Sequence, residues 1–245
     1  MGSPVLPVHS TPIVLVIKYP LMSTREKLPI DDGKHIGKTE VLQNTNFLLI
    51  IVGATSSGKS MVIHHLLERY PHIKNIVSYT TRKKRPTEVD GVFSHFISEE
   101  DFIAKRDSLV CVTERTIEGV IAHYGVQKED LDQVLSGGAA AMHHDMETAS
   151  CFKEELEKLY TPEEVNWYMS KVLTIFLGTS SLFTLKQRYL HRDRVNDSKE
   201  TFIRRLRHEW ILWNRLYGFF PHVVMNDGSI GTVLDEMAQL LNARK

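Results

Sequence analysis

The feature that most constrains this chain is a short loop of glycine, serine and lysine residues between an apolar run and a helical pattern. Phe47–Val52 is continuously apolar, which is typical of a strand buried in a parallel sheet. Residues 53–60 then read Gly-Ala-Thr-Ser-Ser-Gly-Lys-Ser and match the pattern G-x-x-x-x-G-K-[ST] in full. Apolar residues at helical spacing follow this loop. A strand, a loop and a helix in this order predict an α/β fold.

The residue types in this loop are those that bind phosphate. Glycines let the backbone curl so that its N–H groups converge on phosphate oxygens, and the positive end of the next helix adds to the attraction. The lysine supplies a mobile charge for the β- and γ-phosphates, and the last serine can ligate Mg²⁺. A chance turn is the alternative, but the flanking strand and helix favour function. We therefore expect a nucleoside triphosphate to bind Gly53, Ser56, Ser57, Gly58, Lys59, Ser60 and Met61, with Ser60 as the metal ligand.

Apolar runs and helical patterns alternate through the rest of the chain. Further strands are predicted at residues 76–79, 109–113, 139–144, 172–177 and 222–225. Helices are predicted at residues 98–105, 128–135, 147–159, from 161 onward, at 198–217 and at 229–241. Strands that alternate with helices predict a parallel sheet that is covered on both faces.

The first 46 residues differ from this pattern. Prolines interrupt them repeatedly and little periodicity is present; these prolines are Pro4, Pro7, Pro12, Pro20 and Pro29. We expect a partly disordered N-terminal extension over residues 1–46, with one strand at residues 13–17, and a folded domain over residues 47–245.

Composition limits the partners and the location. The 30 basic and 30 acidic side chains cancel, so we expect neither nucleic acid nor a membrane surface as a partner, and protein partners stay open. No apolar stretch approaches the roughly 20 residues that span a bilayer. The two cysteines lack C-x-x-C spacing, which favours reduced thiols and a cytoplasmic location. Lys18 and Arg25 precede the first acidic residue, so organelle targeting stays open.

Four consecutive cations, residues 82–85, follow the strand predicted at residues 76–79. A charge cluster of this kind is usually a solvated surface loop. Its two arginines can equally clamp a dianionic phosphate, because guanidinium donors fit phosphate oxygens in a fork. The cluster alone leaves both interpretations open.

Around this cluster the sequence resembles the guanylate kinase family, whose pattern here is S-x-T-T-R-x-x-R-x-G-E. The chain keeps Ser78, Thr80, Thr81, Arg82, Arg85, Glu88 and, shortly after, Gly91. Further likenesses follow in family order over residues 47–241. They are Tyr124-Gly125, a strand ending at Asp145, an arginine-bearing segment with Arg188, Arg192 and Arg205, and Asn226-Asp227.

The resemblance implies a P-loop NTPase fold, a three-layer sandwich with a central parallel sheet, a small acceptor-binding subdomain and a helical lid. It implies direct in-line phosphoryl transfer from ATP, with Mg²⁺, to a nucleoside monophosphate, foremost GMP or dGMP. The implied catalytic residues, which neutralise charge on the moving group, are Lys59, Arg188, Arg192 and Arg205. Arg82, Arg85 and Tyr124 would hold the acceptor phosphate. Ser78, Glu114 and Asp145 would face its base, and Asn226 would lie near adenine.

Several residues depart from the family pattern. Ser94 stands where a tyrosine is usual, Val126 replaces a hydroxyl residue, and His143 replaces an aspartate. Glu114 matches the base-reading glutamate only if one residue is inserted, and Glu118 is a rival in the same loop. These departures leave open another phosphorylated acceptor, such as a different nucleoside monophosphate or a ribose bisphosphate.

Structural roles are the alternatives for individual residues. Arg188 and Arg192 have the spacing of a solvated helix face, Tyr124 can simply pack, and Asp145 can cap the helix that follows it. A non-catalytic protein-binding module of the same fold is the alternative for the whole chain. The complete Lys59-Ser60 pair argues against that module. The oligomeric state and the role of residues 1–46 stay open.

Overall fold

The computed structural model of the protein describes residues 42–86, 88–117, 119–190, 199–216 and 219–244. The strand predicted at residues 13–17, the predicted lid residue Arg192 and the rival glutamate Glu118 lie outside these ranges.

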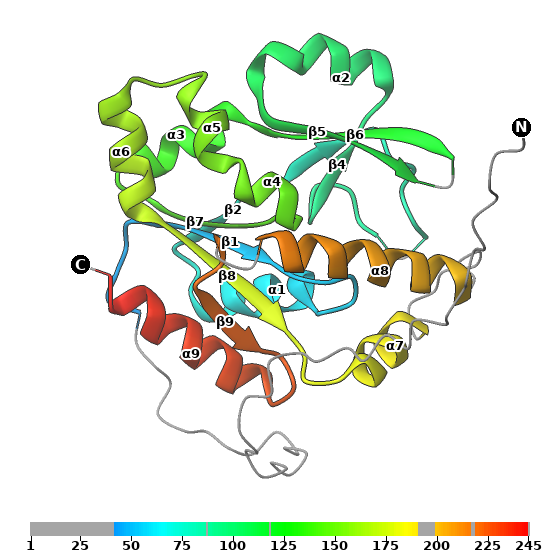
Figure 1. Cartoon of the computed structure of the whole chain (residues 1–245). Helices are drawn as coiled ribbons and strands as arrows, with labels where there is room; N and C mark the ends of the chain where they lie inside the picture. Colours follow the sequence, from blue (N-terminus) through cyan, green and yellow to red (C-terminus); the bar gives the residue numbers. More distant parts are fainter. Residues whose placement is uncertain (1–41, 87, 118, 191–198, 217–218, 245) are drawn as a thin grey trace, which may run out of the picture.

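A five-stranded parallel sheet forms the centre of the molecule (Figure 1). Its order is β2-β7-β1-β8-β9, with bounds Ile73–Asn75, Ala139–His143, Phe47–Val52, Val172–Gly178 and His222–Met225. β1 lies in the middle, pairs in parallel with β7 and β8, and is buried along its whole length. The buried parallel sheet predicted from the apolar runs is thus confirmed.

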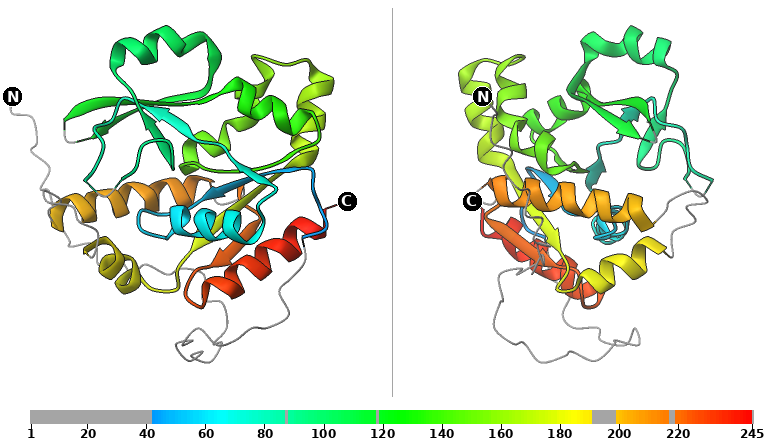
Figure 2. Two further views of the ribbon diagram at one scale, coloured as in Figure 1. Left: turned by 180° about the vertical axis from the view of Figure 1, so that it is seen from behind. Right: turned by 45° about the vertical axis from the view of Figure 1, so that its right-hand side comes forward.

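Two helical layers cover this sheet, because alternate side chains of β1 point to opposite faces. Leu48, Ile50 and Val52 join one core, which α3, α4, α5, α6 and α8 complete. Phe47, Leu49 and Ile51 join the other core, which α1 and α9 complete. The bounds are Lys128–Leu135, Met146–Ser150, Phe152–Glu157, Pro162–Lys171, Lys199–Leu216, Lys59–Arg69 and Ile230–Asn242, in that order. Figure 2 shows α1 and α9 together on one side of the sheet. The predicted three-layer sandwich is confirmed.

A second, four-stranded sheet stands above the carboxyl end of β1 (Figure 1). Its order is β4-β3-β6-β5, with bounds Ser94–Phe96, Ser78–Thr80, Val120–Gln127 and Leu109–Ile117. β6 is antiparallel to both β3 and β5. The helix α2 (Glu99–Lys105), capped by Ser98 as predicted, and the short η1 (Arg106–Ser108) connect β4 to β5. This sheet forms the small subdomain, but the sequence did not indicate β6 or the full length of β5.

Two predicted elements differ from the structure. The strand predicted at residues 76–79 overlaps only β3, because residues 76 and 77 connect β3 to β2, which the sequence did not indicate and which belongs to the other sheet. Ile76 N in this connection donates to Ala141 O at 2.9 Å. The helix predicted at residues 147–159 is α4 and α5, because Cys151 leaves helical angles (φ −100°, ψ 11°). Met146 and Phe152 are six positions apart and would diverge on a continuous helix, but the break lets both reach one core.

The remaining segments pack at the edges. α7 (Leu182–Leu190) contributes Leu185 and Tyr189 to a small cluster with Phe202 of α8. Gln43 N donates to Asn242 Oδ1 at 2.7 Å and Leu42 is buried, so the end of the predicted extension packs against α9. Among the described residues, no helix combines the length and the apolar character that crossing a membrane requires.

Candidate functional site

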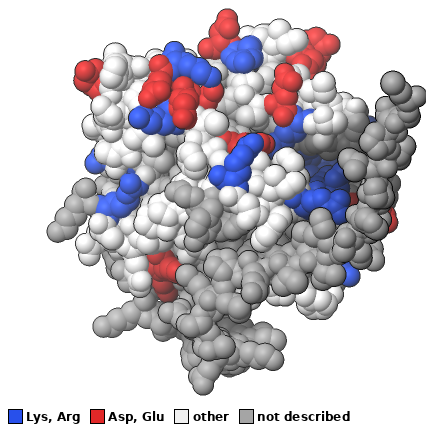
Figure 3. Space-filling model, in the orientation of Figure 1, with Lys and Arg blue, Asp and Glu red and all other residues white. Residues whose placement is uncertain are grey.

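A cavity of about 670 Å³ lies between the loop after β1 and the small sheet. Figure 3 shows Lys and Arg side chains gathered at a hollow on the right of this face of the molecule. The sequence-predicted residues that line the cavity are Gly53, Ser56, Gly58, Lys59, Ser60, Ser78, Arg82, Arg85, Tyr124 and Asp145. Predicted nucleotide-side and acceptor-side residues therefore meet in one space.

The loop of residues 53–58 is held open by its glycines. Gly58 has φ +99°, and a Cβ there would stand 2.4 Å from Asn226 Nδ2. A Cβ on Gly53 would stand 2.4 Å from Leu177 O. Ser57 N donates to Ala54 O at 3.1 Å and tightens the turn. Neither glycine can gain a side chain without moving a neighbour, so the motif glycines fix the shape of this loop.

Lys59 begins α1 and folds back over the loop. Its Nζ donates to Gly53 O at 2.7 Å and to Ala54 O at 3.1 Å. Ser60, the next residue, also lines the cavity. The Ser60 hydroxyl is an oxygen donor of the kind that Mg²⁺ accepts, and Mg²⁺ usually takes few protein ligands and relies on substrate phosphates and water.

Arg188 and Asn226 contact the back of the same loop. The Asn226 side chain is buried, and its Nδ2 donates to Ser57 O at 2.7 Å. Arg188, from α7, donates to Ser57 O at 3.3 Å and to Asn226 O at 2.8 Å. Both residues thus join α7 and the turn after β9 to the loop without lining the cavity.

Some predicted residues lie away from the cavity. Ser57 is fully buried behind the loop, and Met61 is 63% exposed on α1. Arg205 is half-buried on α8 and is not among the residues that line the cavity. Glu114 is exposed and pairs with His123 Nε2 at 3.2 Å.

A contact that sequence reasoning missed joins the loop to α8. Thr55 donates to Glu209 Oε1 from its backbone N at 2.8 Å and from its hydroxyl at 2.6 Å. Glu209 Oε2 is buried and has no hydrogen-bond partner among the described residues. Both residues line the cavity. No sequence pattern pointed to Glu209, because it is a single acid directly after the basic run of residues 204–208.

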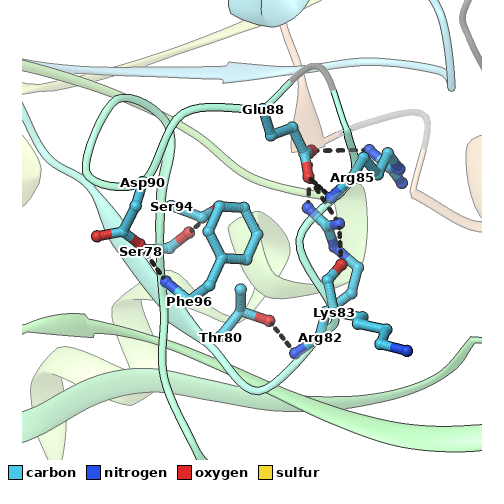
Figure 4. A network of polar contacts seen from close by, with 9 residues as sticks. All are labelled: Ser78, Thr80, Arg82, Lys83, Arg85, Glu88, Asp90, Ser94 and Phe96. Carbon is cyan, nitrogen blue, oxygen red and sulfur yellow. Dashed lines mark hydrogen bonds and ion pairs between the residues drawn. The ribbon is translucent and has the colours of Figure 1, made fainter.

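Arg82 and Arg85 share the carboxylate of Glu88 (Figure 4). Arg82 donates from both terminal nitrogens to the two Glu88 oxygens, each at 2.9 Å. Arg85 donates from its backbone N at 2.8 Å and from Nη1 at 3.0 Å. Arg82 also lies over the Phe96 ring, 5.1 Å from the centroid. The predicted phosphate clamp is therefore a fixed arrangement rather than a solvated charge run.

Electrostatics reinforce this arrangement. Burial opposes the charged form of Glu88, but the bonds from Arg82 and Arg85 outweigh it and lower the Glu88 pKa. Burial likewise opposes the charge on Arg82, yet Glu88 and the neighbouring Tyr124 raise its pKa. Tyr124 lies on β6 and lines the cavity beside Arg82. The three predicted acceptor-phosphate residues thus stand together.

Asp145 also lines the cavity, and it both caps α4 and forms an ion pair. It accepts from Thr148 N at 2.9 Å and from Thr148 Oγ1 at 2.6 Å. The guanidinium of Arg115 pairs with the same carboxylate. Burial raises the Asp145 pKa, but Arg115 and Thr148 outweigh burial and lower it. Arg115 was not predicted as a site residue, although it adjoins Glu114 on β5.

His143 and His144, at the end of β7, also line the cavity. Burial, with Lys59 and His144 nearby, lowers the pKa of His143 to about 3. Burial also lowers the His144 pKa, with Asp145 acting in the opposite direction. His143 is therefore neutral at ordinary pH, where the family pattern predicts a negative charge.

The comparisons with known proteins agree on one family. A family model described as guanylate kinase matches residues 45–243. Guanylate kinase of Rhizobium etli is 30% identical over 81% of this chain and 82% of its own length. A guanylate kinase of Pseudomonas fluorescens is 30% identical over 75% of this chain and 81% of its own length. The crystal structure of guanylate kinase from Anaplasma phagocytophilum is similar with a TM-score of 0.58 and 22% identity, covering 83% of this chain and 88% of that one.

Proposed function

The chain belongs to the guanylate kinase family, and we propose that it transfers the γ-phosphoryl group of ATP to GMP or dGMP. The products are ADP and GDP or dGDP. The observation that supports this most is the shared cavity, in which Lys59 and Ser60 face the same space as Arg82, Arg85 and Tyr124. A cavity with a phosphate loop at one side and an arginine clamp at the other suits transfer between two phosphates.

On the donor side, we assign the ATP phosphates to the loop backbone, Lys59 and Ser60. The glycines of the loop and its bonds to Asn226 and Arg188 fix its shape. Ser60 would hold Mg²⁺, which neutralises charge on the β- and γ-phosphate oxygens. Lys59 would turn its ammonium from the loop carbonyls towards those oxygens. A fixed positive environment of this kind needs little reorganisation during transfer.

On the acceptor side, we assign the monophosphate to Arg82, Arg85 and Tyr124. Glu88 orients both guanidinium groups before substrate arrives. An arginine has more N–H donors than Arg82 uses on Glu88, so a phosphate can bind while the ion pair persists. The acceptor oxygen then attacks the γ-phosphorus in line, with no covalent enzyme intermediate.

Three arginines form the proposed lid over the cavity. We assign Arg188, Arg192 and Arg205 to the closed state, in which they would neutralise the transferring group and help to exclude water. Arg188 already contacts the loop through Ser57 O. Closure would require α7 and α8 to approach the small sheet.

The wider proposal is a cytoplasmic enzyme with ATP and Mg²⁺ as cofactors and nucleotides as partners. The free thiols of Cys111 and Cys151 support a reducing location. The balanced charge supports the expectation that neither nucleic acid nor a membrane surface is a partner.

A coupled assay of ADP release tests the activity. Mg-ATP is supplied with GMP, dGMP, AMP, CMP, UMP or a ribose bisphosphate, and Lys59→Ala is the inactive control. Turnover with GMP and dGMP that the control lacks is the expected result. Turnover with a different acceptor would replace the proposed substrate. Failure to bind ATP would favour a protein-binding module instead.

A further inference from the structure

Arg115 lines the cavity from β5 of the small sheet, and the register of β5 explains why. The pairing of β5 with β6 shifts between Val110 and Thr113, and beyond that irregularity Thr113 lies opposite Tyr124. Side chains then alternate, so Thr113 and Arg115 line the cavity while Glu114 faces outward towards His123. The strand irregularity thus turns an arginine, rather than a glutamate, towards the cavity.

The Asp145 carboxylate beside Arg115 already has hydrogen-bond and ion-pair partners. Asp145 accepts from Thr148 twice and pairs with Arg115. The ring of Tyr124 lies 6.0 Å from the Arg115 guanidinium carbon and bounds it on another side. Asp145 therefore acts as a positioning residue that aims the guanidinium, and its own oxygens are engaged.

Hydroxyl groups on the small sheet also line the cavity. They belong to Thr113, Ser78 and Ser94, and the two serine hydroxyls lie 3.3 Å apart. The remaining carboxylates that line it are Glu88, held by two arginines, and Glu209, held by Thr55. This side of the cavity therefore presents hydrogen-bond donors to a base.

We propose that Arg115 is a specificity-determining residue that reads the O6 and N7 atoms of the acceptor guanine, an inference that rests on the proposed function. Guanine carries these two acceptors side by side, and a guanidinium fork matches them. Adenine presents N7 next to an amino group, which would confront a second donor. Recognition through this edge does not use the 2-amino group of guanine.

A series of GMP analogues tests this assignment. Inosine monophosphate keeps O6 and N7 but lacks the 2-amino group, whereas 7-deaza-GMP replaces N7 with carbon. We expect kcat/KM for inosine monophosphate within about fivefold of GMP, and a loss of about tenfold or more for 7-deaza-GMP, because a bond to a charged donor is lost. Dissociation constants from calorimetry without ATP should follow the same order.

Variants connect the effect to the side chain. Arg115→Ala should weaken GMP about 30-fold and bring GMP and 7-deaza-GMP to the same affinity. Arg115→Lys keeps the charge but loses the fork, so it should retain only part of the discrimination. Arg106→Ala, at an exposed arginine outside the cavity, is the matched control and should change neither value.

The outcomes separate the inference from the proposed function. If inosine monophosphate is rejected while 7-deaza-GMP behaves like GMP, the opposite base edge is read and the inference fails. If GMP binds with a dependence on N7 that Arg115→Ala removes, yet is not phosphorylated, the inference holds and the proposed activity fails. If GMP does not bind at all, both are overturned.

Discussion

The two ends of the cavity are built in different ways. The phosphate-loop end is local: its shape comes from contiguous residues, and Lys59 donates to carbonyls of its own loop at 2.7 and 3.1 Å. The part where we propose that the acceptor base binds, called the base end here, contains Arg115 and Asp145 and is assembled from distant segments. Arg115 of β5 pairs with Asp145, which follows β7, only because the two sheets place these strands together. Backbone geometry sets the first end, and paired side chains set the second.

This difference explains where change is tolerated. The loop depends on glycine angles and backbone N–H groups, so most substitutions there disturb phosphate binding directly. The base end depends on which face of β5 points into the cavity. The single irregularity in β5 turns the Arg115 side chain inward and the Glu114 side chain outward. We expect the loop end to be essential for any transfer and the base end to decide only which acceptor is used.

Replacing Lys59 should have the largest effect. Lys59→Ala removes the mobile charge from the donor phosphates, and kcat should fall about a thousandfold, the scale of losing one preorganised electrostatic group. Circular dichroism and the thermal midpoint should stay near those of the unaltered protein, because Lys59 is only part-buried. Unchanged turnover in this variant would show that the loop is not the donor site.

Replacing Arg82 should affect one substrate selectively. Arg82→Ala removes two bonds to Glu88 and a donor for the acceptor phosphate. The KM for GMP should rise about 30-fold or more, while that for ATP should change less than about threefold. Lys84→Ala, at an exposed cation in the same loop, is the control. Equal effects on both substrates would remove Arg82 from the acceptor site.

Replacing Glu209 should strengthen substrate binding, whereas replacing Lys59 or Arg82 should impair the enzyme. Its carboxylate lies at the loop through Thr55 and would repel a bound triphosphate. Glu209→Gln keeps an acceptor for Thr55 but removes the charge, so the KM for ATP should fall by about three- to fivefold. Glu209→Ala loses both the charge and the contact to Thr55. Comparing the two variants separates the effect of the charge from the effect of the contact. A raised KM in the Gln variant would instead mean that the negative charge helps to bind the metal–nucleotide complex.

The smallest expected effect concerns stability and pH. His143 has a pKa of about 3 against an ordinary 6.5, so the unfolded chain takes up the proton first as the solution is acidified. Its contribution to the free energy of unfolding therefore falls as pH drops below about 6.5. The unaltered protein should lose free energy of unfolding between pH 7.5 and pH 5.5, and in His143→Asn this loss should be smaller by about 1 kcal/mol. Urea unfolding at the two pH values measures the difference.

The matched control substitution for that experiment is His72→Asn, at an exposed histidine outside the cavity. An identical acid sensitivity in His143→Asn and in the unaltered protein would show that His143 is not held neutral by its surroundings.

The difference between locally built and distantly assembled parts also decides how much of the structure the sequence predicts. The apolar runs predicted the central strands, and Ser98, Thr161 and Ser229 were correctly expected to begin helices, because these signals act over a few residues. The parallel sheet and the helical layers on its two faces followed from the alternation of strands with helices. Local signals thus carried most of the fold.

Long-range pairing accounts for what the sequence did not predict. β6 and the register shift at residues 110–113 depend on contacts between distant residues, so the inward turn of Arg115 and the outward turn of Glu114 had no local signal. The contact from Thr55 to Glu209 spans 154 positions. Ser78, Arg82, Arg85, Tyr124 and Asp145 were placed by resemblance, and the structure brings them to one cavity without testing their roles.

The central claim is that one cavity holds both phosphates, and a bisubstrate ligand tests it most directly. Adenosine and guanosine joined by five phosphates should compete with ATP and with GMP, and it should bind at least about 100-fold more tightly than either, because linkage makes the second contact intramolecular. Inhibition kinetics and calorimetry measure both properties. Competition with only one substrate, or an affinity no higher than that of ATP alone, would contradict a shared cavity.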